Sequence, residues 1–515
     1  MYGKVSFMES TQKCRLAIFG IGMHFQETYS AAFRRNSINS IAEIVWVADL
    51  QDRKDLVMER CRIAEQNPLF VGIEKFDDIK LPESIKYKLD KTLADNPVDC
   101  FLISTTPEQH RAYVEWAIEK GIDILLDKPL SSRDNAMSDI EAARGIEDDW
   151  RSMNDAAQKK NVSIMVNSHR RFHPAYKKVG EILKETAEQT GCGVTMISTF
   201  NSDGQWRFPK ELRDIQYHGY NTGNGVVSHF GYHYLDIDMY WYRMGTPEKQ
   251  RADEMIVSSE MLSAQDYAKI IPSAMATNAL RNAGQPAVDD DDVSVIKDLD
   301  SYGEVDAYVE LDLLKNKSKS CHITIQMVHS GFSQRAWTTP AVNLYKENGR
   351  VRWENHLIQQ GPFQAIEIRS FQAVQPSWKH PDENINRWEL GGADHVEINI
   401  YRNKILGKPA LETINAKDLM EIIPKHDVIH EDIKANVLMY FIVYVAQKKQ
   451  LPILRKIPQD VTEKVNGLKE NGPYDLSLFF THQATTALMS ACYESNAISI
   501  NKPELSNRIS KNIYW

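Results

Sequence analysis

The stretch CRLAIFGIGMHFQETYSAAFRRNSINSIAEIVWVAD, residues 14–49, decides the fold. It opens with a short apolar run, residues 14–22, that ends in glycines, and a helical pattern follows from about His24 to Arg35. A second apolar run, residues 41–49, closes on an aspartate. Strand, glycine turn, helix and strand in this order are typical of the βαβ unit of a parallel sheet.

Strand and helix patterns continue to alternate after this unit. Further strands are expected at residues 98–105, 122–127 and 162–169. Four or more strands alternating with helices predict an α/β domain, a doubly wound Rossmann-type parallel sheet, over residues 11–170. Two stretches look inserted into this domain. Residues 64–92 are charged and loop-like, and residues 134–155 form a polar helix rich in acidic residues.

The sequence pattern changes after about residue 171. Short β-rich segments separated by turn signals follow one another, at residues 304–314, 321–328, 341–347, 349–355 and 365–371. This pattern is typical of an antiparallel sheet, so we expect an α+β domain with a large, open, mostly antiparallel sheet over residues 171–430. Helical character returns near residue 432, which predicts a helical C-terminal extension over residues 431–515 that packs on the other domains.

Composition excludes several classes of protein. The chain has 515 residues, of which 42% are hydrophobic, so a large core can form and wholesale disorder is excluded. Its 61 lysines and arginines are outnumbered by 70 acidic residues, which argues against nucleic acid as a partner. The N-terminus lacks an apolar signal segment, and the apolar run 435–446 is too short to span a membrane, so a cytoplasmic protein without membrane contact is expected.

The cysteines fit the same compartment. Six of them are scattered without the spacing of a zinc site or of a disulfide framework, at positions 14, 61, 100, 192, 321 and 492. Unpaired, scattered cysteines indicate a reducing environment.

The glycine turn after the first strand is a candidate dinucleotide site. The first glycine allows the tight turn, and the second lets the backbone approach a pyrophosphate, although Phe25 replaces the third glycine of the usual motif. Asp49, at the end of the next strand, stands where an acid binds the adenosine ribose, which favours NAD, while Arg53 leaves NADP open. An ordinary turn with a capping aspartate is the alternative. The cofactor residues expected here are Gly20, Ile21, Gly22, Met23 and Asp49.

A lysine follows the strand at residues 122–127. The segment STTPEQHRAYVEWAIEKGIDILLDKP, residues 104–129, contains a threonine-rich strand end, a helix pattern and then this strand. Ligands of open α/β sheets bind at the carboxyl ends of strands, where Thr105 and Lys128 both lie. Pro129 keeps Lys128 out of helical conformation, so the ammonium can bind a substrate hydroxyl at the sheet edge. A turn with a solvated lysine is the alternative.

These motifs together resemble the glucose–fructose oxidoreductase, inositol dehydrogenase and rhizopine-catabolism (Gfo/Idh/MocA) family over roughly residues 14–415. Members carry a T-P-x-x-x-H segment, which Thr105, Thr106 and His110 match with threonine in place of proline. They also carry Glu-Lys-Pro, which Asp127 and Lys128 match with aspartate in place of glutamate. The resemblance implies that Lys128 is the catalytic lysine, and that it binds the cofactor together with Thr105, Thr106, His110 and Asp127.

The family pattern continues into the second domain. Arg170, Arg171, Phe172 and Pro174 match the family's R-R-F-x-P stretch, and TGNGVVSHFGYHYLDIDMYW, residues 222–241, resembles its G-G-x-L-x-D-x-G-x-H-x-x-D pattern. On a helix, His229, His233 and Asp236 share one face. His233 is the candidate acid/base, since imidazole titrates near neutral pH.

Other interpretations of the same three residues stay open. His229 stands where many members have aspartate, and it can relay a proton or bind a substrate hydroxyl. Two histidines and an acid on one face can also bind a metal ion, or they can be structural. The resemblance implies no metal, so none is expected.

The loop before this pattern is expected to line the substrate pocket, because the family uses the same region for that purpose. It contains Asn201, Trp206, Arg207, Tyr217 and His218, whose aromatic and hydrogen-bonding groups suit a sugar or polyol. A surface loop would contain them too. The substrate-binding residues expected overall are Arg171, Asn201, Trp206 and Asp236.

The sequence therefore predicts an NAD(P)-dependent oxidoreductase that moves hydride between a nicotinamide and a hydroxyl-bearing carbon of a sugar, sugar derivative or cyclitol. NAD is the expected cofactor, with NADP possible. Two alternatives are an NAD-dependent glycosidase acting by transient oxidation and a dinucleotide-binding regulator without turnover. The resemblance also implies a homo-dimer or homo-tetramer.

Overall fold

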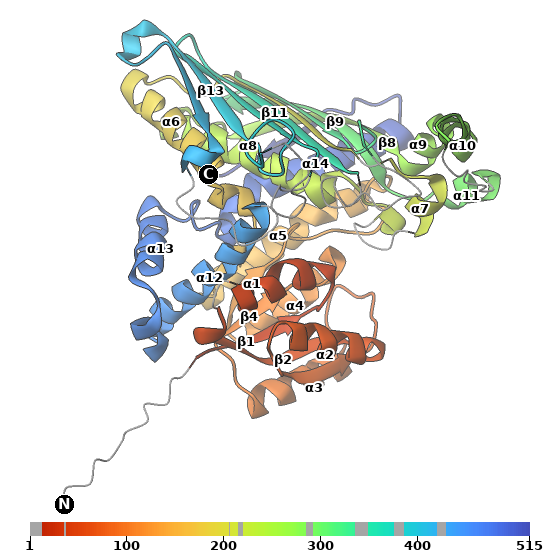
Figure 1. Ribbon diagram of the computed structural model, residues 1–515, viewed down its shortest axis with the longest axis vertical. Coiled ribbons are helices and arrows are strands. Elements are labelled where there is room, and N and C mark those ends of the chain that lie inside the picture. Colours follow the sequence, from red (N-terminus) through yellow and green to blue (C-terminus); the bar gives the residue numbers. More distant parts are fainter. Residues whose placement is uncertain are drawn as a thin grey trace, which may run out of the picture. The chain divides into compact units, whose positions relative to one another are not determined.

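The computed structural model describes residues 13–35, 38–204, 206–214, 220–284, 292–334, 349–374, 386–419 and 429–515. They fold into two compact units (Figure 1). The first unit contains the described residues up to Asp127, with Met153–Asn167 and Glu431–Phe479. The second contains the described residues of Lys128–Ser152, Ser168–His430 and Phe480–Trp515. The division into 11–170, 171–430 and 431–515 stays a prediction from the sequence.

A six-stranded parallel sheet forms the centre of the first unit, in the order β3-β2-β1-β4-β5-β6. This is the doubly wound Rossmann order, so the predicted fold class is confirmed. Its central strands are buried apolar runs, because helices cover both faces of such a sheet. The strands are β1 (Cys14–Phe19), β2 (Ala42–Leu50), β3 (Leu69–Ile73), β4 (Cys100–Ile103), β5 (Asp123–Leu126) and β6 (Ile164–Val166).

Helices connect these strands. A π-helical turn (Phe25–Tyr29) runs into α1 (Ser30–Arg35) after β1, and the others in this part of the chain are α2 (Lys54–Ile63), α3 (Glu83–Asp95), α4 (Pro107–Glu119) and α5 (Ile140–Lys160). The prediction of a loop over residues 64–92 is wrong, since the segment contains β3 and most of α3. The apolar run of β3 is only five residues long and stands between charged segments, so its strand signal is weak.

The C-terminal part of the first unit contains α12 (Ile429–Lys449) and α13 (Gln459–Asn471). The Tyr444 hydroxyl lies 3.0 Å from Ser163 Oγ, and Lys448 Nζ donates to Asp123 at 2.7 Å, so α12 is fixed beside β5 and β6. The apolar run of α12 is a buried helix, as predicted. None of the described helices is both long enough and apolar enough to cross a membrane.

A nine-stranded sheet dominates the second unit, in the order β14-β13-β12-β11-β7-β10-β9-β8-β15. All neighbouring strands pair antiparallel except β7 and β10, which confirms the predicted large, mostly antiparallel sheet. The strands are β7 (Met196–Gly204), β8 (Glu254–Ser263), β9 (Glu304–Lys315), β10 (Ser318–Val328), β11 (Val351–Gln360), β12 (Gln364–Gln372), β13 (Glu397–Arg402), β14 (Leu411–Asn415) and β15 (Ile509–Asn512). The strand predicted at 341–347 lies outside the described residues.

Three long helices pack on this sheet, namely α6 (Pro174–Thr190), α8 (Tyr232–Met244) and α14 (Gln483–Asn501) (Figure 1). Residues 232–242 of α8 and 483–498 of α14 are buried all round, because the two helices pack on each other and α14 also packs on β8. A helix buried on every side carries its polar residues into the core, where each needs a partner. The shorter helices of this unit are α7 (Pro209–Asp214), α9 (Ala264–Ile270), α10 (Ser273–Asn282) and α11 (Asp292–Asp298).

Candidate functional site

The two glycines of the turn after β1 serve different purposes. Gly20 has φ +81°, and a Cβ there would lie 2.6 Å from the Ser104 carbonyl oxygen, so the close approach of β1 to β4 requires glycine. A Cβ on Gly22 would meet nothing within 4 Å. The space beside the Gly22 backbone is therefore open, as an approaching pyrophosphate requires, and the turn fits a dinucleotide.

Asp49 fixes this turn from β2. Its carboxylate accepts hydrogen bonds from the backbone N–H of Ile21 at 2.6 Å and of Leu50 at 2.7 Å, and Arg53 pairs with it at 3.0 Å. Asp49 is buried, whereas Met23 at the start of the helix is 56% exposed. These contacts match the alternative that Asp49 caps an ordinary turn. The contact of Asp49 with the adenosine ribose stays a prediction.

The turn after β4 contains the second predicted cofactor segment. Thr106 is the N-cap of α4 and is exposed, with Pro107 as the first helical residue. The buried His110 ring holds this turn from inside the helix, since its Nε2 lies 3.2 Å from the Thr105 carbonyl oxygen. His110 therefore supports the turn, and Thr105 and Thr106 are its accessible residues.

Asp127 stands at the end of β5 with its carboxylate surrounded by donors. The Tyr29 and Ser104 hydroxyls each donate to it at 2.5 Å, and His24 Nε2 lies 3.6 Å away. Burial alone would raise the pKa of Asp127, but His24 and the hydroxyl donors outweigh burial and hold that pKa well below its usual range. Asp127 thus ties the ends of β4 and β5 to the helix after β1. Its predicted cofactor contact stays a prediction.

Lys128, the next residue, belongs to the second unit and so do both candidate histidines. Lys128 Nζ donates a hydrogen bond to the backbone carbonyl of His229, in the π-helical turn Val227–Gly231 that runs directly into α8. His233 follows one helical turn later, is 7% exposed and packs edge-on against the His169 ring at 4.2 Å. The structure therefore brings Lys128 to the segment that carries His229 and His233.

Arg171 and Asp236, both predicted to bind substrate, bind each other. Arg171 Nη2 and Nε donate to the two carboxylate oxygens of Asp236 at 2.5 and 2.8 Å, and neither residue is more than 1% exposed. Ser168, Thr485 and His482 complete the shell at 2.5, 2.9 and 3.0 Å. Burial alone would raise the pKa of Asp236, but Arg171 and His482 hold it below its usual range.

Asn201 and Trp206, the other two predicted substrate residues, lie apart from that pair. Asn201 is buried on β7 and donates a hydrogen bond to the Tyr234 hydroxyl. Trp206 is half-buried and stacks on Phe208, with ring centroids 5.7 Å apart and planes inclined by 22°. Tyr217 and His218 lie outside the described residues.

Sequence reasoning missed most of the polar residues that surround α8. Glu354 on β11 accepts two hydrogen bonds from Arg170, at 2.6 and 2.8 Å, and the Tyr176 and Tyr234 hydroxyls also contact its carboxylate. No local signal marks these partners, since Arg170 and Glu354 are 184 residues apart. His482 and Thr485, which contact Asp236, were also missed, and so were Thr481, which contacts Arg171, and Glu304 and Tyr493, which contact the turn before α8.

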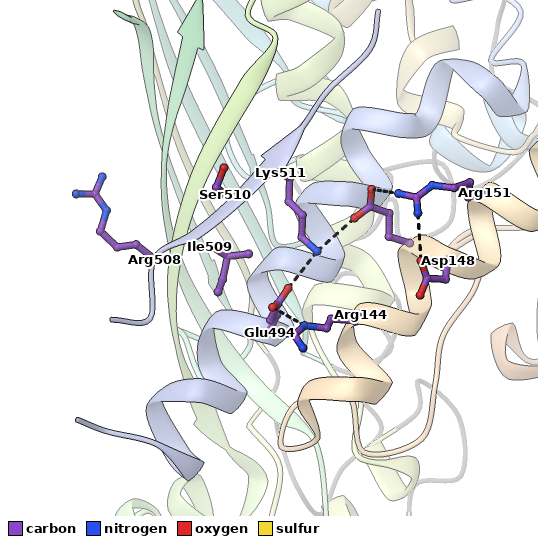
Figure 2. Close-up of a pocket in the computed structure, with 9 residues that line it drawn as sticks. Arg144, Asp148, Arg151, Glu494, Arg508, Ile509, Ser510 and Lys511 are labelled. Atoms are coloured by element: carbon purple, nitrogen blue, oxygen red, sulfur yellow. Dashed lines mark hydrogen bonds and ion pairs between the residues drawn. The ribbon is translucent and has the colours of Figure 1, made fainter. Parts of the chain in front are cut away.

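No group of three histidine, cysteine or acidic side chains in the described ranges is arranged to bind a metal ion. A charged pocket of about 390 Å³ does occur in the second unit, but none of the predicted site residues line it. Dashed lines in Figure 2 mark the ion pairs of Arg144 and Lys511 with Glu494 and of Arg151 with Asp148, and Lys511 of β15 also lies 3.3 Å from Glu147. These ion pairs therefore hold β15 against α5 and α14.

Comparison with known proteins adds a family and a fold. Residues 14–168 match a family model described as "Oxidoreductase family, NAD-binding Rossmann fold". No curated protein matches the chain.

Solved structures that resemble the chain cover nearly its whole length at low identity. An inositol dehydrogenase homolog from Azotobacter vinelandii, complexed with NADH and myo-inositol, is 12% identical, with a TM-score of 0.54 and 98% of each chain covered. An oxidoreductase from Agrobacterium radiobacter is 13% identical, with a TM-score of 0.53, 97% of this chain and 98% of that one covered. A levoglucosan dehydrogenase complexed with NADH and levoglucosan is 12% identical, with a TM-score of 0.52, 98% of this chain and 100% of that one covered. At this identity the likeness concerns the fold.

Proposed function

Because the chain belongs to the Gfo/Idh/MocA oxidoreductase family through its NAD-binding domain, residues 14–168, we propose that it oxidises a hydroxyl-bearing carbon of a sugar, sugar derivative or cyclitol with NAD. The family expected from the sequence motifs is confirmed by this match. The substrate class is our proposal, and the shared fold of the levoglucosan and inositol dehydrogenases supports it.

The open backbone at Gly22 supports binding of the dinucleotide in the first unit. We propose that NAD is preferred over NADP. The buried Asp49 carboxylate would repel a 2′-phosphate, and the Arg53 guanidinium that could attract this phosphate is paired with Asp49 at 3.0 Å.

Bound NAD supplies the hydride acceptor that turns a carbinol into a carbonyl. Lys128 binds and polarises the substrate hydroxyl before it is oxidised, since an ammonium group offers three N–H donors. His233 takes the hydroxyl proton as the general base, and His229 is a second group that can bind or relay it. Arg171 and Asp236, which bind each other, act as positioning residues for α8 in place of direct substrate contact.

The hydrogen bond from Lys128 to the His229 carbonyl is the observation that carries this proposal. It holds the ammonium at the turn that leads into α8, and His233, the proposed partner of Lys128 in proton transfer, stands in the first turn of that helix. A dinucleotide-binding regulator has no need for such a pair.

A substrate panel tests the function directly. The purified chain is mixed with NAD and with sugars and cyclitols one at a time, and the absorbance of reduced nicotinamide is followed. Lys128→Ala and His233→Ala should each lower kcat by about 100- to 10,000-fold, because each removes a proton-transfer or polarising group. The NAD affinity should stay within about threefold, because the proposed pyrophosphate turn lies in the first unit.

Two control variants separate chemistry from general damage. Lys178→Ala removes a half-exposed lysine that pairs with Glu181 on α6, and His322→Ala removes an exposed histidine that pairs with Asp312, so both should keep full activity. Full activity in Lys128→Ala contradicts the assigned role. Hydrolysis of a glycoside without net cofactor reduction indicates the glycosidase instead, and NAD binding without any turnover indicates the regulator.

A further inference from the structure

A buried glutamate faces the start of the histidine-bearing segment. Glu304, the first residue of β9, is 0% exposed, and its Oε1 accepts a hydrogen bond from the backbone N–H of Val227 at 2.9 Å. Its backbone carbonyl also accepts the N–H of Val226 at 3.0 Å. Val227 is the first residue of the π-helical turn, so Glu304 binds amide groups that a helix start leaves without intrahelical partners.

Tyr493 of α14 joins the same contact from the other side. Its hydroxyl lies 2.9 Å from Glu304 Oε1 and accepts the backbone N–H of Ser228 at 3.1 Å and of Gly225 at 3.5 Å. Tyr493, like Glu304, is fully buried. One carboxylate and one hydroxyl thus hold together three elements that lie far apart in the sequence: the turn, β9 and α14.

The backbone in this region has no room to shift. A Cβ on Gly225 would lie 1.9 Å from the Glu304 carbonyl oxygen, and a Cβ on Gly303 would lie 1.8 Å from the Asn224 carbonyl oxygen. Such close backbone contact fixes the turn relative to β9. The position of the turn therefore follows the position of Glu304.

This turn carries the groups assigned to catalysis. His229 lies in it and accepts the Lys128 hydrogen bond, and His233 stands in the first turn of α8 directly after it. We propose that Glu304 and Tyr493 are positioning residues that set the His229 carbonyl and the His233 ring for the reaction, an inference that rests on the proposed function.

Glu304 also titrates in the physiological range. Burial raises its pKa to about 7, although the hydrogen bonds from Val227 and Tyr493 act in the opposite direction. Among the described residues, Tyr493 and Cys492 of α14 and Tyr220 interact electrostatically with this carboxyl. Burial raises the pKa of each of them, so all three stay uncharged near neutral pH. Ionisation of Glu304 near neutral pH therefore places a negative charge beside the turn.

Three variants test the positioning role. Tyr493→Phe removes the hydroxyl and leaves Ser228 N–H without that acceptor, whereas Glu304→Gln can keep Oε1 as the acceptor for Val227. Tyr242→Phe is the matched control, because its buried hydroxyl accepts Ala252 N–H at 2.9 Å near the opposite end of α8. The readouts are kcat and KM, NAD affinity, and amide hydrogen exchange of residues 224–233 by mass spectrometry.

We expect Tyr493→Phe to lower kcat by about 10- to 100-fold, as small misplacements of reacting groups do, and to speed exchange in residues 224–233. NAD affinity should change by less than about twofold. Glu304→Gln should keep most of kcat and should lose the part of the wild-type pH profile near pH 7 that comes from Glu304. Tyr242→Phe should leave kcat and this exchange as they are.

Unchanged kcat and unchanged exchange in Tyr493→Phe overturn the proposal, and so does an equal loss of kcat in Tyr242→Phe. If Glu304→Gln and the wild type have identical pH profiles, ionisation of Glu304 does not affect turnover, and that part of the proposal is wrong. If the wild type turns over no sugar or cyclitol, the proposed function fails. Hydrogen exchange then still decides whether Glu304 and Tyr493 hold the turn, since it needs no turnover.

Discussion

Replacing Asp236 by asparagine should destabilise the second unit strongly. The Asp236 carboxylate accepts hydrogen bonds from Arg171 at 2.5 and 2.8 Å, from Ser168 at 2.5 Å and from Thr485 at 2.9 Å. It is 0% exposed. Asparagine keeps the shape, but it replaces one acceptor oxygen by an NH2 group that faces donors. The substitution also removes the carboxylate charge that pairs with the buried Arg171 guanidinium at 2.5 Å.

The size of the effect follows from this burial. Removing one partner of a buried ion pair costs about 3–5 kcal/mol, because the remaining charge stays desolvated. Native proteins are stable by only about 5–15 kcal/mol, so Asp236→Asn removes a large fraction of the stability. Replacing both partners by apolar residues of similar size is often close to neutral. The double variant Arg171→Met with Asp236→Leu should therefore be more stable than Asp236→Leu alone.

Urea unfolding followed by tryptophan fluorescence measures these differences. Trp241 is fully buried on α8, the helix that carries Asp236, and is one of ten tryptophans in the chain, so its emission contributes to the unfolding signal. The pH dependence has a definite sign. The pKa of Asp236 is lowered in the folded state, so the pair stabilises the fold above the unfolded-state aspartate pKa of about 4, and this contribution is lost as the pH falls below it.

The difference between wild type and Asp236→Asn should accordingly shrink as the pH is lowered below about 4. Two results would refute the reasoning. One is an Asp236→Asn variant as stable as the wild type at pH 7. The other is a double variant no more stable than Asp236→Leu, since the charge left on Arg171 would then cost nothing.

Further variants test the glycine turn and the buried glutamate. Gly22→Ala should fold normally but bind NAD at least about tenfold more weakly by calorimetry, because its Cβ fills open space beside the backbone. Gly20→Ala should also lower the melting temperature, because its Cβ would lie 2.6 Å from the Ser104 carbonyl at φ +81°; equal melting temperatures for the two variants would contradict this. Burial raises the pKa of Glu304 to about 7, so the folded state holds this proton more tightly than the unfolded state does. As the pH rises from 4.5 to 7, the free energy of unfolding of the wild type should therefore fall by about 3 kcal/mol relative to that of Glu304→Gln. A stability difference that does not change over this range in urea titrations would rule out the raised pKa.

Short sequence patterns were sufficient to predict the parallel sheet and the positions of its turns. The glycine turn, Asp49 and Lys128 each follow a short apolar run, and the carboxyl ends of parallel strands meet at one edge of the sheet. The spacing of His229, His233 and Asp236 suited a helix, and the structure has His229 in the π-helical turn and the other two residues in α8 directly after it. These inferences succeed because strand, turn and helix signals are local in sequence.

The partners of the buried charges were not predictable in this way. Arg171 and Asp236 were each expected to bind the substrate, whereas in the structure each is the partner of the other. Asp127 was assigned to the cofactor, but the hydroxyls of Tyr29 and Ser104 bind its carboxylate. Spacing shows that a carboxylate lies at a strand end, but the donors that reach it come from distant segments that only the fold brings close.

The C-terminal segment Phe480–Trp515 illustrates why such contacts determine a site. The extension predicted over residues 431–515 was expected only to pack on the other domains, yet this part of it supplies Thr485 and His482 to Asp236 and Tyr493 to Glu304. These contacts lie at the start and in the first turns of the segment that carries His229 and His233, and all of them are buried. Buried polar groups are costly unless paired, so α8 can carry Asp236 in its core only with α14 beside it. The C-terminal segment therefore supports the turn and the helix that carry His229 and His233. Without it, the Asp236 and Glu304 carboxylates would lose part of their hydrogen bonding.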